Sequence, residues 1–285
     1  MALKKKTIPD FLKMKEEGQK VTWITSYDYL TAKYVERSGM DMILVGDSMG
    51  MVQLGYDTTF PVTMDDMIRS CQAVRRGAPN TFIVGDMPYM SYQESNEEAI
   101  ANAGRFIKES GCDCVKLEGG TELIVERMRA ITQAGIAAIG HIGLTPQFMA
   151  QIGGYKAQGK SAAAVAKLIE QVKKLEEAGA WSVLIEGVPT IAGKAVHDAV
   201  NIPVYGIGAG SQVDGQLIIY ADMVGYYDDF TPKFVKRYAE VGKVLQDAFT
   251  AYVEEVRNGA FPEDDKHTYK ISPEEAAAVE KLMEK

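Results

Sequence analysis

The sequence predicts a (β/α)8 barrel, an α/β fold in which eight parallel strands alternate with helices around a closed sheet. Short apolar runs rich in Val and Ile alternate with stretches of helical periodicity along most of the chain. Four of these runs end in a carboxylate, at Asp47, Asp86, Glu118 and Glu186. Seven or eight strand–helix units in 285 residues favour a barrel over a doubly wound sheet, which usually needs fewer strands.

The first half of the chain is expected to contain five strands with helices between them. Each expected strand is a short apolar run, and each expected helix repeats its apolar residues at helical spacing. The expected strands are Val21–Thr25, Met42–Asp47, Phe82–Asp86, Cys114–Glu118 and Ile136–Gly140. The expected helices are Tyr29–Ser38, Met64–Arg76, Ser95–Ser110 and Thr121–Ala134.

The second half continues the alternation after a glycine-containing connection over residues 143–160. A helix is expected at Ala162–Ala178, followed by a sixth strand at Trp181–Glu186. Pro203–Ile207 is the expected seventh strand, and Met223 with its neighbours forms a weaker eighth.

The segment from Lys233 onward has a helical pattern and is expected to serve packing or assembly. Ser272 and Glu275 have the spacing of a capping box, and Pro273 occupies the first helical position. We therefore expect one barrel domain over residues 1–285, with a helical tail over residues 270–285.

The composition disfavours nucleic acid and membrane as partners. The net charge is -8 and the isoelectric point is near 5.1, whereas phosphate binding needs a basic field. The basic cluster Lys4–Lys6 is short and is typical of solvated surface. The chain shows neither an export signal nor an apolar stretch of about 18 residues. Cys71, Cys112 and Cys114 include no C-x-x-C pair, which favours free thiols and a cytoplasmic location.

Asp47, Asp86 and Glu118 end the second, third and fourth expected strands. The carboxyl ends of barrel strands converge on one rim, so these three side chains are expected to share one coordination shell. Oxygen ligands without an accompanying Cys or His set suit Mg2+ better than Zn2+. The alternative is that each acid only caps the following helix. The presence of three acids on adjacent strands makes this interpretation less favourable.

Lys116 precedes Glu118 by two positions, so both side chains are expected on the inner face of the same strand. An inward lysine among acids is suited to neutralising a substrate carboxylate or oxyanion, the alternative being an ion pair that serves packing alone. Ser48 directly follows Asp47 and offers a hydroxyl and a backbone N–H at a helix start, where an ordinary cap is equally favoured.

Glu186 ends the sixth expected strand, across the mouth from the three acids and among apolar neighbours. An apolar setting disfavours the charged carboxylate and raises its pKa, which suits a general base; a strand-end cap is the alternative. His141 follows the fifth expected strand and is placed to hydrogen-bond a substrate oxygen, although a structural histidine is nearly as favoured.

Gly206–Gly210 holds three glycines after the seventh expected strand, where many barrels bind phosphate. A glycine cluster alone is a weak signal, so a tight turn or a close backbone approach is favoured over a phosphate site.

Several segments taken together closely resemble the ketopantoate hydroxymethyltransferase family. The resemblance covers about residues 5–269 in order. The matching segments are Val45–Gly50, Pro61–Thr63, Ala73–Pro79, Val115–Gly120, Gly140–Gln147, Gly153–Lys156, Glu186 before Val188-Pro189, Gly206–Gly210, Asp214–Gln216 and Pro232–Tyr238.

The resemblance implies a (β/α)8 barrel of the phosphoenolpyruvate mutase and pyruvate kinase-like group, assembled as a homodecamer. It implies hydroxymethyl transfer from 5,10-methylenetetrahydrofolate to 3-methyl-2-oxobutanoate, giving 2-dehydropantoate on the way to pantothenate and coenzyme A. The implied Mg2+ ligands are Asp47, Asp86 and Glu118. The implied contacts of the 2-oxo acid are Asp47, Ser48, Asp86, Lys116 and His141, and Glu186 is the implied proton acceptor.

Three departures from the family pattern bear on folate contacts and on the substrate side chain that the pocket accepts, and the first is Gly187, which stands where the family often has Cys or Ala. Lys266–Tyr269 replaces the usual family ending and is followed by an extension, and Tyr226–Asp229 alters the loop after the eighth strand. Two other functions stay open. One is a lyase or mutase acting on another 2-oxo acid without folate, and the other is a noncatalytic metal-binding barrel.

Overall fold

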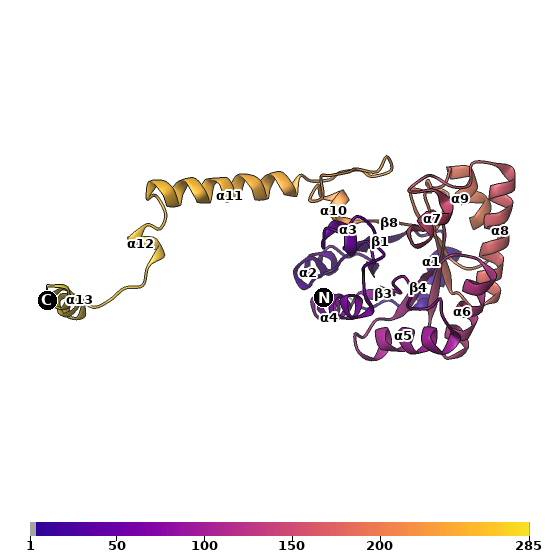
Figure 1. Ribbon diagram of the computed structural model, residues 1–285, viewed down its shortest axis with the longest axis horizontal. Coiled ribbons are helices and arrows are strands. Elements are labelled where there is room, and N and C mark those ends of the chain that lie inside the picture. Colours follow the sequence, from indigo (N-terminus) through magenta and orange to yellow (C-terminus); the bar gives the residue numbers. More distant parts are fainter. Residues whose placement is uncertain (1–3, 285) are drawn as a thin grey trace. The chain divides into compact units, whose positions relative to one another are not determined.

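The computed structural model describes residues 4–284, and the prediction of a barrel is confirmed. Eight parallel strands pair in chain order, and β1 pairs with β8 to close the sheet (Figure 1). The chain divides into two compact units, one ending at Tyr238 and the other beginning at Ala239. The barrel lies in the first unit, and whether residues 1–285 act as one domain stays a prediction.

The strands are short and form a closed sheet, and the helices surround that sheet (Figure 1). The strands are β1 Val21–Thr25, β2 Met42–Val45, β3 Phe82–Asp86, β4 Cys114–Glu118, β5 Ala138–Gly143, β6 Ser182–Glu186, β7 Val204–Ile207 and β8 Gly215–Ile218.

Four of the longer helices of the first unit begin at a side-chain cap. Thr63 and Asp66 form a reciprocal capping box, and the side chains of Ser95, Thr121 and Ser161 each accept a backbone N–H of the first turn. The helices are α1 Ile8–Glu16, α2 Tyr29–Arg37, α3 Met49–Val52, α4 Met64–Gly77, α5 Asn96–Lys108, α6 Glu122–Gln133, the 3-10 turn η1 Pro146–Phe148, α7 Met149–Ile152, α8 Ala162–Glu177, α9 Thr190–His197 and α10 Tyr220–Met223.

The predicted eighth strand around Met223 is wrong, because Met223 ends helix α10 and the eighth strand is β8 at Gly215–Ile218. Gly215 and Gln216 are not typical strand residues, so the pattern gave no signal there. A Cβ added at Gly215 would lie 2.4 Å from the Val21 carbonyl oxygen, so closure of the barrel against β1 requires glycine. Helix α1 had no counterpart among the expected elements.

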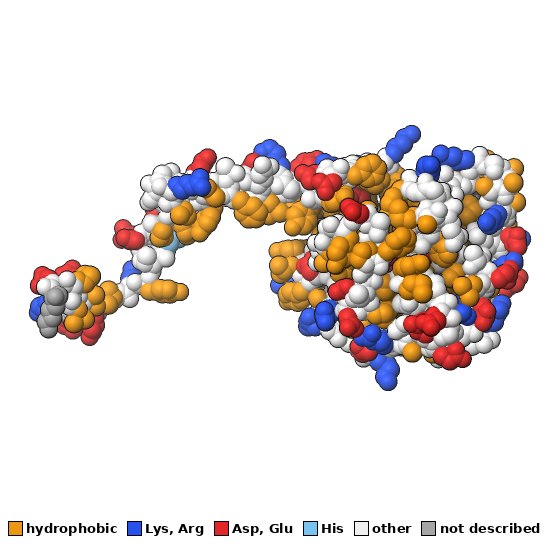
Figure 2. Space-filling view, viewed as in Figure 1, with side chains coloured by type: hydrophobic (Ala, Val, Ile, Leu, Met, Phe, Trp, Pro, Cys, Tyr) orange, Lys and Arg blue, Asp and Glu red, His pale blue; other side chains and the backbone are white. Residues whose placement is uncertain are grey.

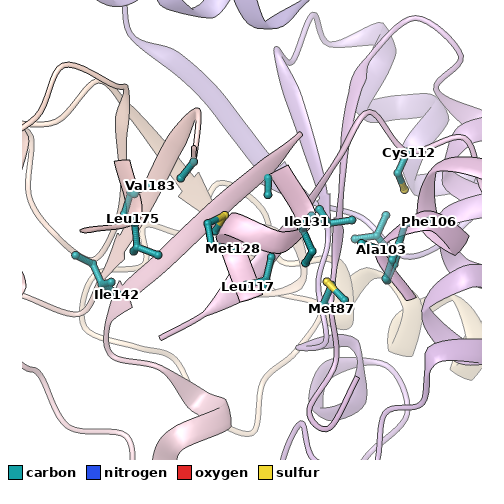
Figure 3. Close-up of a cluster of buried hydrophobic side chains, with 14 of the residues drawn as sticks. Met87, Ala103, Phe106, Cys112, Leu117, Met128, Ile131, Ile142, Leu175 and Val183 are labelled. Carbon is teal, nitrogen blue, oxygen red and sulfur yellow. The ribbon is translucent and has the colours of Figure 1, made fainter. Parts of the chain in front are cut away.

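Alternation along β4 divides the side chains between two layers. Val115 and Leu117 face outward and join the large apolar cluster between strands and helices, part of which is drawn in Figure 3. Cys114 belongs to the separate cluster inside the barrel. Lys116 and Glu118 continue that inner face toward the carboxyl end of the strand. The pattern that builds the core therefore also aims these charged groups into the barrel.

Helix α1 closes the opposite end of the barrel. Phe11 is fully buried, 5.2 Å from the ring of Phe82 and 5.8 Å from that of Trp181, measured between ring centroids. Both partners lie at or just before the start of a strand, so Phe11 plugs the amino ends of the strands. Lys15 on the same helix pairs with Asp214 at 2.8 Å.

In the second unit, as far as residue 284, the helices are α11 Val241–Asn258, α12 Asp264–His267 and α13 Pro273–Met283. Half of the predicted capping box is confirmed, because the Ser272 hydroxyl accepts the backbone N–H of Glu275 at 3.3 Å, whereas among residues 4–284 no bond joins the Ser272 backbone N–H to the Glu275 side chain. Hydrophobic side chains gather along one side of α11 (Figure 2). Among the residues described here, no helix combines the length and the apolar character that crossing a membrane requires.

Candidate active site

Three acidic side chains converge at the carboxyl ends of neighbouring strands. Asp86 and Glu118 are the last residues of β3 and β4, and Asp47 follows shortly after β2. One carboxylate oxygen of each lies within 4.8 Å of the others, and all three residues are buried. The fold therefore brings together the three residues that the sequence predicts as metal ligands.

Strand register explains why Lys116 lies among these acids. Asp86 on β3 is paired with Lys116 on β4, so the two residues are side by side. Lys116 Nζ lies 2.8 Å from Asp86 Oδ1 and 3.3 Å from Glu118 Oε1. Because the side chain is only 2% exposed, the cluster contains one fixed and almost fully buried cation.

His141 connects the acid cluster to Glu186. It lies within β5, paired in register with Glu118, and does not follow the strand as expected. Its Nδ1 is 3.2 Å from Glu118 Oε1, and its Nε2 is 3.1 Å from Glu186 Oε2. The expectation that Glu186 stands apart among apolar neighbours is therefore wrong, because an imidazole ring joins it to the cluster.

The charges in the cluster shift one another's pKa values. Burial raises the pKa of Asp47 well above its ordinary value, and the charges of Asp86 and Glu118 add to this effect. Burial also raises the pKa of Asp86, although the Lys116 charge opposes the shift. For Glu118 burial is outweighed by Lys116, by His141 and by hydrogen bonds, which lower its pKa to about 2.

The pKa values of the two basic side chains, Lys116 and His141, are both raised by the neighbouring carboxylates. Burial would lower the pKa of Lys116, but the carboxylates of Asp86, Glu118 and Asp47 outweigh it and raise the value. Burial and the Lys116 charge would lower the pKa of His141, but Glu118 and Glu186 raise it to about 9. These shifts favour the charged form of both side chains, and Lys116 Nζ also lies 3.2 Å from His141 Nδ1.

The donor set fits a divalent cation. Asp86 Oδ1 is buried and receives no hydrogen bond from the residues of the described part of the chain, although Lys116 lies within ion-pair distance. Three crowded carboxylates repel one another, and a cation placed among them would relieve that repulsion. Carboxylate oxygens without thiolate ligands are the set that Mg2+ prefers.

Helix capping does not account for these acids. The side chains that cap α5 and α6 are Ser95 and Thr121, not the strand-end acids that precede them. Asp86 Oδ2 instead accepts the backbone N–H of Asp47 at 3.1 Å, which ties the ends of β3 and β2 together.

Ser48 precedes α3 but makes no side-chain cap to that helix. Its hydroxyl lies 2.8 Å from the hydroxyl of Tyr27, a fully buried residue just after β1. Burial raises the pKa of Tyr27, so the phenol stays protonated at neutral pH. Sequence reasoning missed Tyr27, whose position directly after a strand was the available signal.

Gln147 and Tyr92 are also part of the site and were not predicted. The Gln147 side chain donates to Asp47 Oδ2 at 2.9 Å, and the Tyr92 hydroxyl donates to Gln147 Oε1 at 2.6 Å. Gln147 follows β5 in the Gly140–Gln147 segment, and Tyr92 lies between β3 and α5. A polar residue after a strand was the only signal for either.

The glycines at 206–210 serve close packing. Gly208 and Gly210 have positive φ values of 62° and 81°. A Cβ added at Gly208 would lie 2.6 Å from the Phe234 ring, and one at Gly210 would lie 2.3 Å from the Thr190 hydroxyl oxygen. These contacts favour the close backbone approach over a phosphate site.

Sequence comparison finds relatives over nearly the whole chain. The family model described as Ketopantoate hydroxymethyltransferase matches residues 5–264. A 3-methyl-2-oxobutanoate hydroxymethyltransferase of Alkaliphilus metalliredigens (strain QYMF) is 55% identical over 268 residues, which are 94% of this chain and 94% of that protein. One of Clostridium novyi (strain NT) is 51% identical over 267 residues, 94% of this chain and 96% of its own.

Structural comparison finds the same barrel in more distant proteins. The crystal structure of 2,3-dimethylmalate lyase, a PEP mutase/isocitrate lyase superfamily member, superimposes with a TM-score of 0.60 at 15% identity, covering 97% of this chain and 95% of that one. Phosphonopyruvate hydrolase in complex with oxalate and Mg++ gives a TM-score of 0.59 at 13% identity, covering 98% and 97%. At this level of identity the likeness shows the fold alone.

Proposed function

The chain belongs to the ketopantoate hydroxymethyltransferase family, and we propose that it transfers a hydroxymethyl group from 5,10-methylenetetrahydrofolate to 3-methyl-2-oxobutanoate. The products are 2-dehydropantoate and tetrahydrofolate, with one water consumed. The observation that carries the proposal is the acid cluster at the barrel mouth, with Lys116 inside it and His141 linking it to Glu186.

Asp47, Asp86 and Glu118 would hold Mg2+, which when bound supplies Lewis-acid stabilisation of negative charge on the substrate oxygens. Lys116 is proposed to face the keto oxygen or the carboxylate of the 2-oxo acid. Its buried ammonium is already fixed by Asp86 and Glu118, so no reorganisation is needed when the substrate oxygen gains charge. Ser48, held by Tyr27, is proposed to bind the substrate carboxylate.

Glu186 is proposed to accept the proton from C3 of the substrate. It ends β6 and is the acid of the mouth that lies outside the three-carboxylate cluster. The positively charged ring of His141 contacts one oxygen of Glu186 and so orients the carboxylate. The electron pair left at C3 forms the new carbon–carbon bond to the one-carbon unit. That bond and a C–O bond from water replace the two carbon–nitrogen bonds to the folate, whose nitrogens take up the two protons released from C3 and from water.

The cellular setting and the assembly are proposed from the family. We place the protein in the cytoplasm as a homo-oligomer, most consistently a homodecamer, acting on small molecules. The exposed apolar side of α11 supports a role for the second unit in assembly.

The direct test is an assay of the purified protein with 3-methyl-2-oxobutanoate, methylenetetrahydrofolate and Mg2+, run beside other 2-oxo acids. Formation of 2-dehydropantoate supports the proposal. Turnover of a different 2-oxo acid without folate would instead favour a lyase or mutase.

A further inference from the structure

Gln147 is an amide side chain buried beside the acid cluster, with 3% of its surface exposed. It lies in the turn η1 after β5, so it reaches the cluster from a strand that provides none of the three acids. Its Nε2 donates to Asp47 Oδ2 at 2.9 Å and to the Met87 carbonyl oxygen at 2.9 Å. Its backbone N–H donates to Glu118 Oε2 at 3.0 Å.

Tyr92 fixes which way the amide points. Its hydroxyl donates to Gln147 Oε1 at 2.6 Å and accepts the backbone N–H of Glu118 at 3.1 Å. A flipped amide would place its oxygen against the acceptors Asp47 Oδ2 and Met87 O, and would move the Tyr92 hydroxyl proton from the amide oxygen at 2.6 Å to the Glu118 carbonyl oxygen at 3.3 Å. Every hydrogen-bonding group of the amide is satisfied in one orientation only.

Gln147 therefore hydrogen-bonds one carboxylate oxygen of each of two acids from different strands. Asp47 Oδ2 and Glu118 Oε2 are held, whereas Glu118 Oε1 turns toward Lys116 and His141. Within residues 4–284 no donor hydrogen-bonds Asp47 Oδ1, so that oxygen is left for a ligand. Groups that fix unused ligand oxygens in this way preserve metal affinity in many proteins.

We propose that Gln147 is a positioning residue of the acid cluster and that Tyr92 holds it in its working orientation. Together they hold Asp47 Oδ2 and Glu118 Oε2 in place, which leaves Asp47 Oδ1 for the cation. The inference rests on the proposed function only through the magnesium site, and it requires no folate chemistry.

The test measures Mg2+ binding alone, by calorimetry on protein freed of metal with a chelator. Gln147→Met removes the amide, retains an unbranched side chain of similar length and keeps the backbone donor to Glu118. Tyr92→Phe removes the hydroxyl that binds both the amide oxygen of Gln147 and the backbone N–H of Glu118. We expect the Kd for Mg2+ to rise about 10–100-fold in Gln147→Met and about tenfold in Tyr92→Phe.

Tyr205→Phe is the matched control, because Tyr205 is a fully buried barrel tyrosine whose hydroxyl has no hydrogen-bond partner in the described part of the structure. Its Kd for Mg2+ should equal that of wild type. Circular dichroism in chelator shows which variants are folded. Raising Mg2+ to saturation should restore most of the turnover of both site variants, which a general structural defect would not allow.

An unchanged Kd in folded Gln147→Met or in folded Tyr92→Phe would overturn the inference for that residue. If Gln147→Met does not fold, Tyr92→Phe tests the positioning role through the hydrogen bonds of its hydroxyl to the Gln147 amide and to the Glu118 backbone. Wild type that binds Mg2+ but forms no 2-dehydropantoate would refute the proposed function and leave the positioning role intact. Wild type that binds no Mg2+ would overturn the positioning role as well.

Discussion

His141 Nε2 lies 3.1 Å from Glu186 Oε2, so one imidazole ring joins the acid of β6 to the cluster on β2, β3 and β4. The other ring nitrogen lies 3.2 Å from Glu118. The two carboxylates raise the pKa of the ring to about 9, which favours its charged form between them. This contact links Glu186 to the acid cluster.

We predict that Glu186→Gln keeps Mg2+ and substrate binding but turns over about two to four orders of magnitude more slowly, the usual effect of a positioned general base. Glutamine retains the shape and loses the basicity. In D2O without folate, NMR should show exchange of the substrate C3 proton with wild type and none with the variant. The surface variant Glu122→Gln serves as control, and C3 exchange at the wild-type rate in Glu186→Gln would move the base to another group.

A second prediction concerns metal dependence. Asp47→Ala and Asp86→Ala should each abolish turnover and leave the fold intact, because each removes a proposed ligand. Calorimetry should show no Mg2+ binding in either variant, and circular dichroism should match wild type. Asp65→Ala, an exposed acid on α4, is the control and should bind Mg2+ normally. Full wild-type activity in excess chelator would contradict the prediction.

Lys116→Met should destabilise the metal-free protein by about 3 kcal/mol, because it leaves buried carboxylates without their cationic partner. Urea unfolding in chelator measures the loss. Adding Mg2+ should recover part of the stability, since the metal supplies positive charge at the same place. A variant as stable as wild type in chelator would show that the ammonium does not hold the cluster together.

At the amino end of the barrel, Asp214 gives a prediction for pH. Burial alone would raise its pKa, but hydrogen bonds from Lys15 and the Val204 N–H and the charges of Lys15 and His197 lower it below 3.8. Its stabilising effect is therefore present above pH 3.8 and is lost as the pH falls through the folded-state pKa. Asp214→Asn should lower the free energy of unfolding by about 1.5–3 kcal/mol at pH 7.

The difference in unfolding free energy between wild type and Asp214→Asn should shrink steadily as urea titrations move from pH 5 to pH 3, in the range of about 3–5 where Asp titrates. Asp65→Asn, on the exposed surface of α4, should show a much smaller difference. If the difference in unfolding free energy between wild type and Asp214→Asn stays constant over this range, the carboxylate charge does not contribute to stability.

The assembly prediction is tested by light scattering. We expect a mass well above the 31.2 kDa of one chain, and a homodecamer in the fullest form of the prediction. Phe249 and Tyr252 on α11 are 65% and 58% exposed, so Phe249→Ser with Tyr252→Ser should lower the mass if α11 forms the contact. A monomer at micromolar concentration would refute the oligomer.

The sequence by itself determined the barrel and the acids of its mouth. Val- and Ile-rich runs that end in Asp86, Glu118 and Glu186 reveal both the strands and the rim, because strand periodicity and chain order are local properties. The spacing of Lys116 and Glu118 placed both on the inner face for the same reason. The prediction of the eighth strand was wrong because β8 is defined by closure against β1 and not by its own apolar pattern.

Only the tertiary structure decided how these residues contact one another. The register of β4, β5 and β6 sets His141 between Glu118 and Glu186, and no local pattern encodes the register between strands. Gln147 and Tyr92 come from loops whose paths depend on the whole barrel, so their hydrogen bonds to the cluster could not be read from spacing. Burial, a property of the packed fold, then sets the pKa values on which the chemistry depends.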